Sequence, residues 1–258
     1  MNRIQSAFGN GKAFIAFLTG GDPSIAVSKE LIGTMEKAGA DLIEIGIPFS
    51  DPIAEGPVIS EANIRALKAG ATVEKLFTLV KDVRQTVRVP FVFLTYLNPV
   101  FRYGYDAFFA RCGECGIDGI IIPDLPYEES AEVKVHAAKH GVDLISLIAP
   151  TSEDRIKEIA QNAEGFIYLV SSMGVTGVRG EIKTDLSAMV SAVREAARTP
   201  TAVGFGVHAP DQAREIAKIA DGVIVGSAIV KIIAEYGENA CRPVYEYVKA
   251  MKEAVSGT

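Results

Sequence analysis

Cysteine, long apolar runs and a leader segment are scarce or missing in this chain of 258 residues. Three cysteines are too few, and odd in number, for a disulfide framework. No apolar stretch approaches the roughly 20 residues that a membrane-spanning helix needs. The N-terminal MNRIQSAFGNGK also lacks the apolar segment of a signal peptide. We therefore expect a cytoplasmic protein that does not cross a membrane.

An excess of basic side chains is also missing. The formal net charge is −6 and the sequence pI is about 5.2, which argues against nucleic acid or an anionic membrane surface as the main partner. A small anionic ligand stays open, because backbone N–H groups and helix N-termini hold phosphate without many cations. Hydrophobic residues make up 48% of the chain, which is ample for the core of one domain.

Short apolar runs alternate with longer helical patterns from end to end. Eight runs predict strands, at 13–18, 41–47, 90–96, 119–124, 143–149, 166–172, 201–206 and 221–227. They are almost continuously apolar, which is typical of parallel strands covered on both faces. Gly39, Gly116 and Gly141 follow predicted helices and suit a left-handed residue at the helix end. The pattern favours a single (β/α)8 TIM barrel over residues 1–258, with an open doubly wound sheet as the alternative.

Two acidic residues belong to the segment DLIEIGIPFSDPIAEGPVIS, residues 41–60. Glu44 is flanked by Leu42, Ile43 and Ile45, where an ionised carboxylate is costly unless it is paired. One interpretation is a structural glutamate bonded to a neighbouring strand. The other is a general acid/base whose pKa burial raises. Glu55 follows in the loop; alone it would be solvated, but it shares a strand end with Glu44, where barrels place their chemistry.

Glycine-bearing loops follow the last predicted strands, at 171–180, 204–210 and 225–233. None matches a dinucleotide fingerprint or a P-loop. The last two lie where barrels of this kind often bind phosphate, with a short helix beginning at Gly226 and Ser227 that directs its N-terminus at the anion. Gly206 would allow close approach of the backbone. The segment 172–183 is rich in glycine and polar residues and predicts a lid that excludes water, with an ordinary disordered loop as the alternative.

Neither candidate metal motif is convincing. Cys112 and Cys115 form a CxxC pattern without a second pair, so we interpret them as helix packing rather than zinc ligands. His136 and His140 lie on a predicted helix before the fifth strand, away from the expected active face, and indicate a solvated helix surface. The sequence therefore predicts no metal site.

Several long motifs together resemble the tryptophan synthase α subunit family. They are FLTGGDP (17–23), IEIGIPFSDPIAEGPVIS (43–60), NPVFRYG (98–104), DGIIIPDLPYEE (118–129), SSMGVTGVRGEI (171–182), VGFGV (203–207) and VIVGSAIVKII (223–233). The matches keep their order over almost the whole chain. The resemblance implies retro-aldol cleavage of indole-3-glycerol phosphate into indole and glyceraldehyde 3-phosphate.

The resemblance also implies a role for individual residues. Glu44 matches the glutamate that acts as proton donor and then base. Glu55 matches the carboxylate beside the indole N–H, although the commonest family residue there is aspartate. Tyr168 would orient a carboxylate, and Thr176 would meet Glu55 when the lid closes. The implied phosphate contacts are Gly177, Phe205, Gly206, Gly226 and Ser227. An indole ring needs an apolar slot, and the candidates near the ends of the first, third and fourth predicted strands are Phe17, Leu94, Tyr96 and Ile121, with packing in the barrel core as the alternative.

The resemblance further implies a partner. The family passes indole to a pyridoxal-phosphate-dependent tryptophan synthase β subunit, usually in an αββα heterotetramer, and the α chain itself needs no cofactor. Pro48, Asp51, Asp124 and Pro126 match loop residues near that interface. Two other functions stay open at this point: a free-standing lyase with the same residues, and a non-catalytic paralogue that acts as a binding partner. Retention of both carboxylates and of the phosphate glycines argues against the second.

Overall fold

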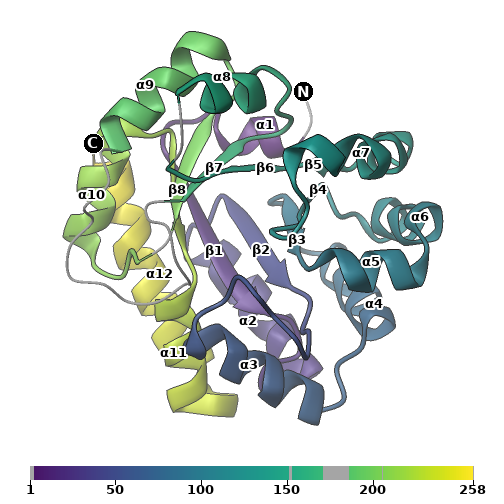
Figure 1. Cartoon of the computed structure of the whole chain (residues 1–258). Coiled ribbons are helices and arrows are strands. Elements are labelled where there is room, and N and C mark those ends of the chain that lie inside the picture. The colour runs from purple at the N-terminus through teal and green to yellow at the C-terminus, as the bar shows by residue number, and fades with distance from the viewer. Residues whose placement is uncertain (1–2, 151–152, 171–185, 205, 258) are drawn as a thin grey trace.

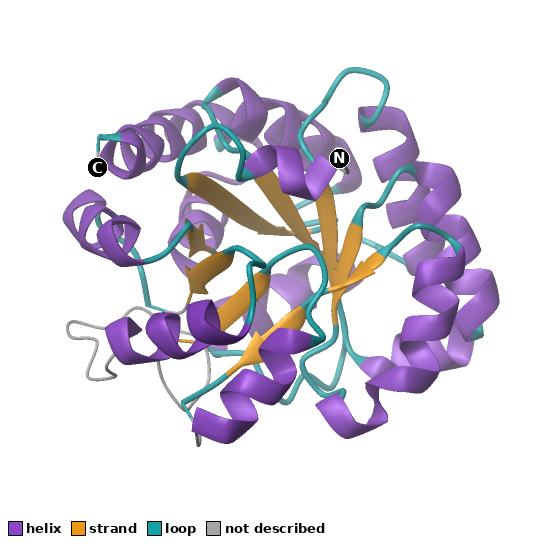
Figure 2. Cartoon of the chain, turned by 90° about the horizontal axis from the view of Figure 1, so that it is seen from above, coloured by secondary structure: helices purple, strands orange, loops and turns teal. Residues whose placement is uncertain are grey.

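The computed structural model describes residues 3–150, 153–170, 186–204 and 206–257, in which parallel strands form a central ring with helices outside it (Figures 1 and 2). The strands are β1 (Ala13–Thr19), β2 (Leu42–Gly46), β3 (Phe91–Leu94), β4 (Gly119–Ile121), β5 (Asp143–Leu144), β6 (Ser146–Ile148), β7 (Ile167–Val170), β8 (Thr201–Gly204) and β9 (Gly222–Val225). Each predicted apolar run contains a strand. The predicted TIM barrel is confirmed.

The barrel closes through one interrupted strand. The sheet order is β5-β4-β3-β2-β1-β9-β8-β7-β6, so its two ends are consecutive in the chain. The run predicted as one strand, 143–149, is divided at Ile145 into β5, which pairs with β4, and β6, which pairs with β7. Ile145 N still donates to Ile120 O at 2.9 Å. Residues 143–148 therefore serve as the fifth of eight barrel strands.

Helices surround the ring, and the first of them covers one end of it (Figure 2). They are α1 (Arg3–Ala7), α2 (Ile25–Lys37), α3 (Pro57–Lys68), α4 (Val73–Val83), α5 (Leu97–Tyr103), α6 (Tyr105–Cys115), α7 (Ser130–Lys139), α8 (Glu153–Gln161), α9 (Leu186–Ala196), α10 (Pro210–Ile219), α11 (Ser227–Tyr236) and α12 (Cys241–Ser256), with short 3-10 turns at Tyr127–Glu129 and Gly237–Asn239. In the part of the chain that the structure describes, no helix has the length and apolarity to cross a bilayer. Gly39, Gly116 and Gly141 have φ of 103°, 92° and 71°, as predicted for helix ends.

Alternation along each strand divides the core into two layers. In β2, Ile43 and Ile45 point outward and pack against the helices. Leu42 points inward and joins a second cluster inside the ring, which Ile4 of α1 also joins, so that α1 covers the N-terminal end of the barrel. Because side chains alternate with a period of two, Glu44 must also point inward. The register that buries the two isoleucines therefore places a carboxyl group inside the barrel.

Candidate active site

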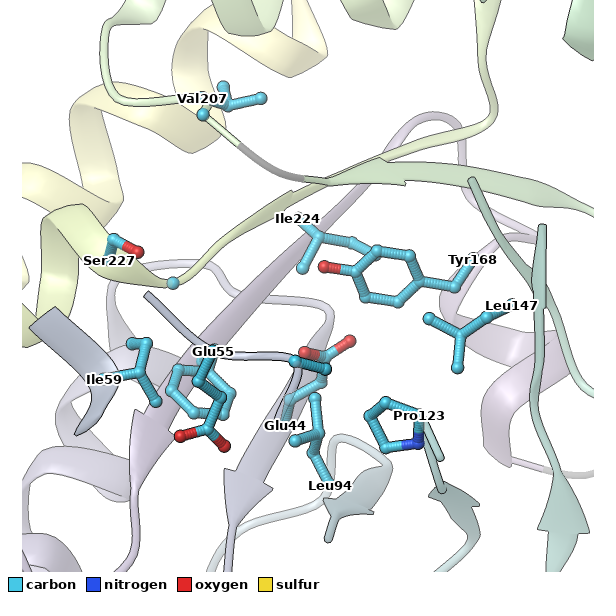
Figure 3. A pocket seen from close by; sticks show the side chains of 14 residues that line it. Glu44, Glu55, Ile59, Leu94, Pro123, Leu147, Tyr168, Val207, Ile224 and Ser227 are labelled. Carbon is cyan, nitrogen blue, oxygen red and sulfur yellow. The ribbon is translucent and has the colours of Figure 1, made fainter. Parts of the chain in front are cut away.

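A cavity lies at the C-terminal ends of the strands and contains both carboxylates predicted from the sequence (Figure 3). Its lining residues come from most of the barrel strands and the loops after them. They are Phe17, Glu44, Ala54, Glu55, Ile59, Leu94, Pro123, Leu147, Tyr168, Gly206, Val207, Ile224, Gly226 and Ser227. Mostly apolar walls with a few polar groups are typical of a small-molecule site. The cavity occupies the end of the barrel where such folds carry their chemistry.

Glu44 is the most perturbed acid in this cavity. Its side chain is 1% exposed, and within the described residues its Oε1 atom has no hydrogen-bond partner. Burial raises the pKa of Glu44 from 4.5 to about 8, because the ionised form loses its hydration without gaining a counter-charge. The carboxyl group therefore carries a proton at neutral pH. A protonated acid facing a cavity can donate that proton to a bound molecule.

Tyr168 faces the same space from the opposite side of the barrel. In Figure 3 the Glu44 carboxyl group points toward the Tyr168 side chain, whose hydroxyl is directed toward the side of Ile224. Burial, and then the nearby Glu44 carboxylate, raise the pKa of Tyr168 well above 10. The hydroxyl therefore stays protonated and can donate a hydrogen bond. This placement agrees with a role in orienting a carboxylate.

Glu55 reaches the cavity from the loop between β2 and α3, on the side of Ile59 (Figure 3). Partial burial raises the pKa of Glu55 from 4.5 to about 7, against the lowering effect of hydrogen bonds from Asn63 and Tyr96. Asn63 Nδ2 donates to Glu55 Oε2 at 2.6 Å. The two acids of one segment therefore have different environments: within the described residues Glu44 Oε1 has no hydrogen-bond donor, whereas Glu55 accepts from Asn63 and Tyr96. Two carboxylates in such different environments can take different roles in one reaction.

The residues predicted from the sequence to contact the substrate phosphate divide into two groups. Gly206, Gly226 and Ser227 line the cavity, and Ser227 is the first residue of α11, so the N-terminus of a ten-residue helix lies at its edge. Gly206 has a φ of 84°, which favours glycine. Gly177 and Phe205 lie outside the described residues, as do Thr176 and the predicted lid at 172–183.

Only some of the residues predicted to form the indole slot line the cavity. Phe17 and Leu94 line the cavity, whereas Ile121 lies in the buried cluster beneath it. Tyr96 is 1% exposed and packs behind the loop, where its hydroxyl accepts a hydrogen bond from Ala54 N at 3.1 Å. Lining residues that the sequence did not single out are Ala54, Ile59, Pro123, Leu147, Val207 and Ile224.

The remaining sequence motifs lie away from this cavity. Cys112 and Cys115 are free thiols on the buried face of α6, as the packing interpretation predicts. His140 Nε2 lies 3.2 Å from Asp106 Oδ1 on the exposed α6–α7 surface. No group of metal-ligating side chains with suitable geometry occurs among the residues that the structure describes. Asp124 Oδ1 accepts from Leu97 N at 2.8 Å and so caps the start of α5.

Comparison with known proteins identifies the family. A sequence model described as tryptophan synthase alpha chain matches residues 5–256. The tryptophan synthase alpha chain of Lacticaseibacillus casei is 47% identical over 255 residues, which cover 99% of this chain and 96% of that protein. The alpha chain of Lactiplantibacillus plantarum is 47% identical over 258 residues, covering 100% of this chain and 97% of the relative.

This chain belongs to the tryptophan synthase alpha chain family. Solved structures agree: tryptophan synthase subunit alpha from Legionella pneumophila superposes with a TM-score of 0.91 at 35% identity, covering 100% of both chains. The family assignment confirms the predicted lyase of tryptophan biosynthesis, whose reaction is the cleavage of indole-3-glycerol phosphate.

Some solved members of the tryptophan synthase alpha family belong to larger assemblies. One is a tryptophan synthase α2β2 complex from Pyrococcus furiosus, whose matching chain has a TM-score of 0.87 and 38% identity, covering 93% of this chain and 98% of that one. In the present chain, large apolar side chains are exposed in the segments that follow β2 and β3; among them, Ile53 is 74% exposed and Phe101 is 64% exposed. These segments belong to the same end of the barrel as the cavity.

Proposed function

We propose that Glu44 and Glu55 carry out the cleavage of indole-3-glycerol phosphate in this chain, and that the chain does so as the α subunit of an αββα tryptophan synthase. The observation that supports this proposal most strongly is Glu44, a buried, protonated carboxyl group that faces an apolar cavity. The reaction consists of proton transfers and the cleavage of one C–C bond. The residues of this chain supply the acid and base that these steps require.

Glu44 acts twice in the proposed reaction. Its proton goes to C3 of the indole ring. Once C3 is protonated, the bond between C3 and the glycerol side chain can break. The resulting carboxylate then accepts the proton of the side-chain hydroxyl as the carbonyl forms. The bonding electrons return to the ring, and indole and glyceraldehyde 3-phosphate are released. One carboxyl group with a pKa of about 8 suits both transfers near neutral pH.

Glu55 and Tyr168 support the charge that develops during these transfers. Protonation of C3 places positive charge on the indole N–H, and an ionised Glu55 beside it would stabilise that charge in a site with little water. The Tyr168 hydroxyl would donate to Glu44 while Glu44 is ionised between the two transfers. Thr176 stays a predicted partner of Glu55.

The substrate phosphate binds, in this proposal, at the edge formed by Gly206, Gly226 and Ser227. Amides at the start of α11 meet a phosphate group with the positive end of a helix dipole, so a chain with a net charge of −6 needs no cluster of cations there. Gly177 and Phe205 stay predicted contacts. Phe17, Leu94 and their apolar neighbours would hold the indole ring.

The proposed partner is a tryptophan synthase β subunit, which would carry the pyridoxal phosphate. Ile53 and Phe101 are exposed in segments at the end of the barrel that carries the cavity, and in this proposal they contact the partner. The three free cysteines fit the proposed cytoplasmic location.

An assay of indole release from indole-3-glycerol phosphate, with and without a β subunit, tests the proposal. We expect slow release by the isolated chain and a large increase with the partner. Fast release that the partner does not change would instead indicate a free-standing lyase. Binding of the partner without any release would indicate a non-catalytic paralogue.

A further inference from the structure

Asn63 is a buried polar residue that does not line the candidate active site but contacts a residue that does. It lies on α3 and is 2% exposed. Its Nδ2 atom donates to Glu55 Oε2 at 2.6 Å, a short distance that is typical of a hydrogen bond to a charged acceptor. Asn63 does not line the cavity. Its hydrogen bond to Glu55 therefore connects it to the site.

The helix that carries Asn63 is anchored to the barrel. Arg65, two residues further along α3, forms a bidentate pair with Asp22 in the loop after β1, with Nε–Oδ1 and Nη2–Oδ2 distances of 2.9 and 2.7 Å. Asp22 is 1% exposed. Paired hydrogen bonds between two planar groups restrict orientation as well as distance. Asn63 is therefore held on a fixed support, while Glu55 belongs to an irregular loop.

A second donor, Tyr96, reaches Glu55 from the segment between β3 and α5. The Tyr96 hydroxyl accepts from Ala54 N at 3.1 Å, which leaves its own hydrogen for the Glu55 carboxylate, and the two side chains are hydrogen-bonded. Tyr96 is held in turn by stacking on Phe49, with ring centroids 5.4 Å apart. Glu55 thus accepts from two residues, one on a helix and one at a strand end.

We propose that Asn63 is a positioning residue for the lyase reaction: its amide holds the flexible Glu55 side chain in one orientation and keeps it ionised beside the indole N–H. Tyr96 supports the same carboxylate. This inference rests on the proposed role of Glu55. The physical basis is that an amide donor stabilises a carboxylate more than a carboxylic acid, and that a glutamate fixed at its far oxygen loses most of its rotational freedom before substrate binds.

The test is the pH dependence of kcat/KM in the variant Asn63→Leu, which keeps the side-chain size and removes the donor. Loss of this donor raises the pKa of Glu55, so a smaller fraction of Glu55 is ionised at pH 7. We expect kcat/KM at pH 7 to fall about 10- to 100-fold, as for loss of a hydrogen bond to a charged group. The acidic limb should move to higher pH, the loss should be smaller near pH 8, and KM should change little. Tyr96→Phe should move the same limb in the same direction.

Asn162→Leu is the matched control. Asn162 also donates its side-chain amide to another side chain, Tyr127 Oη at 2.8 Å, but it lies in the turn after α8 and away from the cavity. We expect this variant to keep the parent pH profile. Glu55→Asp supplies a second test, because the shorter stem cannot make the same contact; adding Asn63→Leu to it should cost less than threefold.

The outcomes separate this inference from the proposed function. A parent-like pH profile in Asn63→Leu, with Glu55→Gln inactive, would overturn the positioning role and leave the lyase proposal intact. An equal loss at every pH, together with a lowered Tm, would show a structural role only and also overturn it. Full activity of Glu55→Gln would remove the role of Glu55, and the inference with it.

Discussion

The ring of Tyr168 lies directly against the backbone of Gly204 on the neighbouring strand. A Cβ atom built at position 204 would stand 2.6 Å from Tyr168 Cζ and 2.8 Å from its Cε1. Contacts this short do not occur in folded proteins, and both residues belong to paired strands, β7 and β8, in the barrel wall. The Tyr168 ring can occupy its observed position only because residue 204 has no side chain.

Gly204→Ala should accordingly displace the Tyr168 ring into the cavity that holds Glu44. We expect kcat for indole release to fall at least tenfold, because misplacement of an orienting group by about 1 Å is costly. The barrel should stay folded, since the clash can be relieved toward the cavity. Circular dichroism and kinetic assays of this variant check both points. Unchanged kcat in a folded variant would contradict the role assigned to Tyr168.

The pKa values of the two acids predict a narrow pH optimum for kcat/KM. Glu55 must be ionised, and its pKa of about 7 sets the acidic limb. Glu44 must be protonated, and its pKa of about 8 sets the alkaline limb. We therefore expect a bell-shaped profile with its maximum between these values. Indole release measured from pH 5.5 to 9.5 tests this, and a maximum below pH 6 would contradict the assignment of acid and base.

The burial of Glu44 also predicts how stability depends on pH. Between 4.5 and about 8 the folded chain keeps a proton at Glu44 that the unfolded chain releases, so the cost of burying this residue grows with pH in that range and is constant above it. Glutamine is neutral throughout. Relative to the parent, Glu44→Gln should therefore gain free energy of unfolding as pH rises, by at most about 1.4 kcal/mol per pH unit.

Urea unfolding of parent and variant at pH 5, 6.5 and 8 measures this difference. Glu158→Gln, which changes an exposed glutamate on α8, is the control for the loss of one glutamate outside the cavity. A Glu44→Gln difference that is constant with pH would show that Glu44 is ionised in the folded protein.

The phosphate site predicts a charge-specific effect at the start of α11. Ser227→Asp places a carboxylate where the substrate phosphate would bind, so repulsion should raise KM for indole-3-glycerol phosphate at least tenfold and lower kcat much less. Ser227→Asp is a cleaner test than a larger residue at Gly226, because a Cβ there would lie 3.3 Å from Phe17 Cδ1. Ser187→Asp, at the first turn of α9 outside the cavity, is the control. A normal KM in Ser227→Asp would contradict the phosphate assignment.

Much of this arrangement can be predicted from the sequence, because apolar runs and glycine-marked helix ends follow local rules. The run around Glu44 is an example: its isoleucines determine the register, and the register turns Glu44 inward. The division of the fifth strand at Ile145 has no local signal, since it depends on which neighbour each half meets when the barrel closes.

Depth inside the barrel is equally hard to predict from the sequence. Ile121 and Pro123 are two residues apart, yet Ile121 is buried beneath the cavity and Pro123 lines it. Tyr96 follows the end of β3 at Leu94 and precedes α5, so the strand alternation no longer directs its side chain. The contact between Asn63 and Glu55 cannot be predicted from the sequence. The two residues are eight positions apart, and the conformation of the loop after β2 determines whether they meet.

The most direct test of the account is indole release by Glu44→Gln, measured in a single turnover with saturating indole-3-glycerol phosphate and the β subunit present. Glutamine keeps the shape of the side chain and cannot donate the proton that C3 requires. We predict at least a hundredfold slower release with substrate affinity within threefold of the parent, since loss of a general acid costs about 10²–10⁴-fold. Release within tenfold of the parent rate would contradict the assignment of Glu44 as the acid.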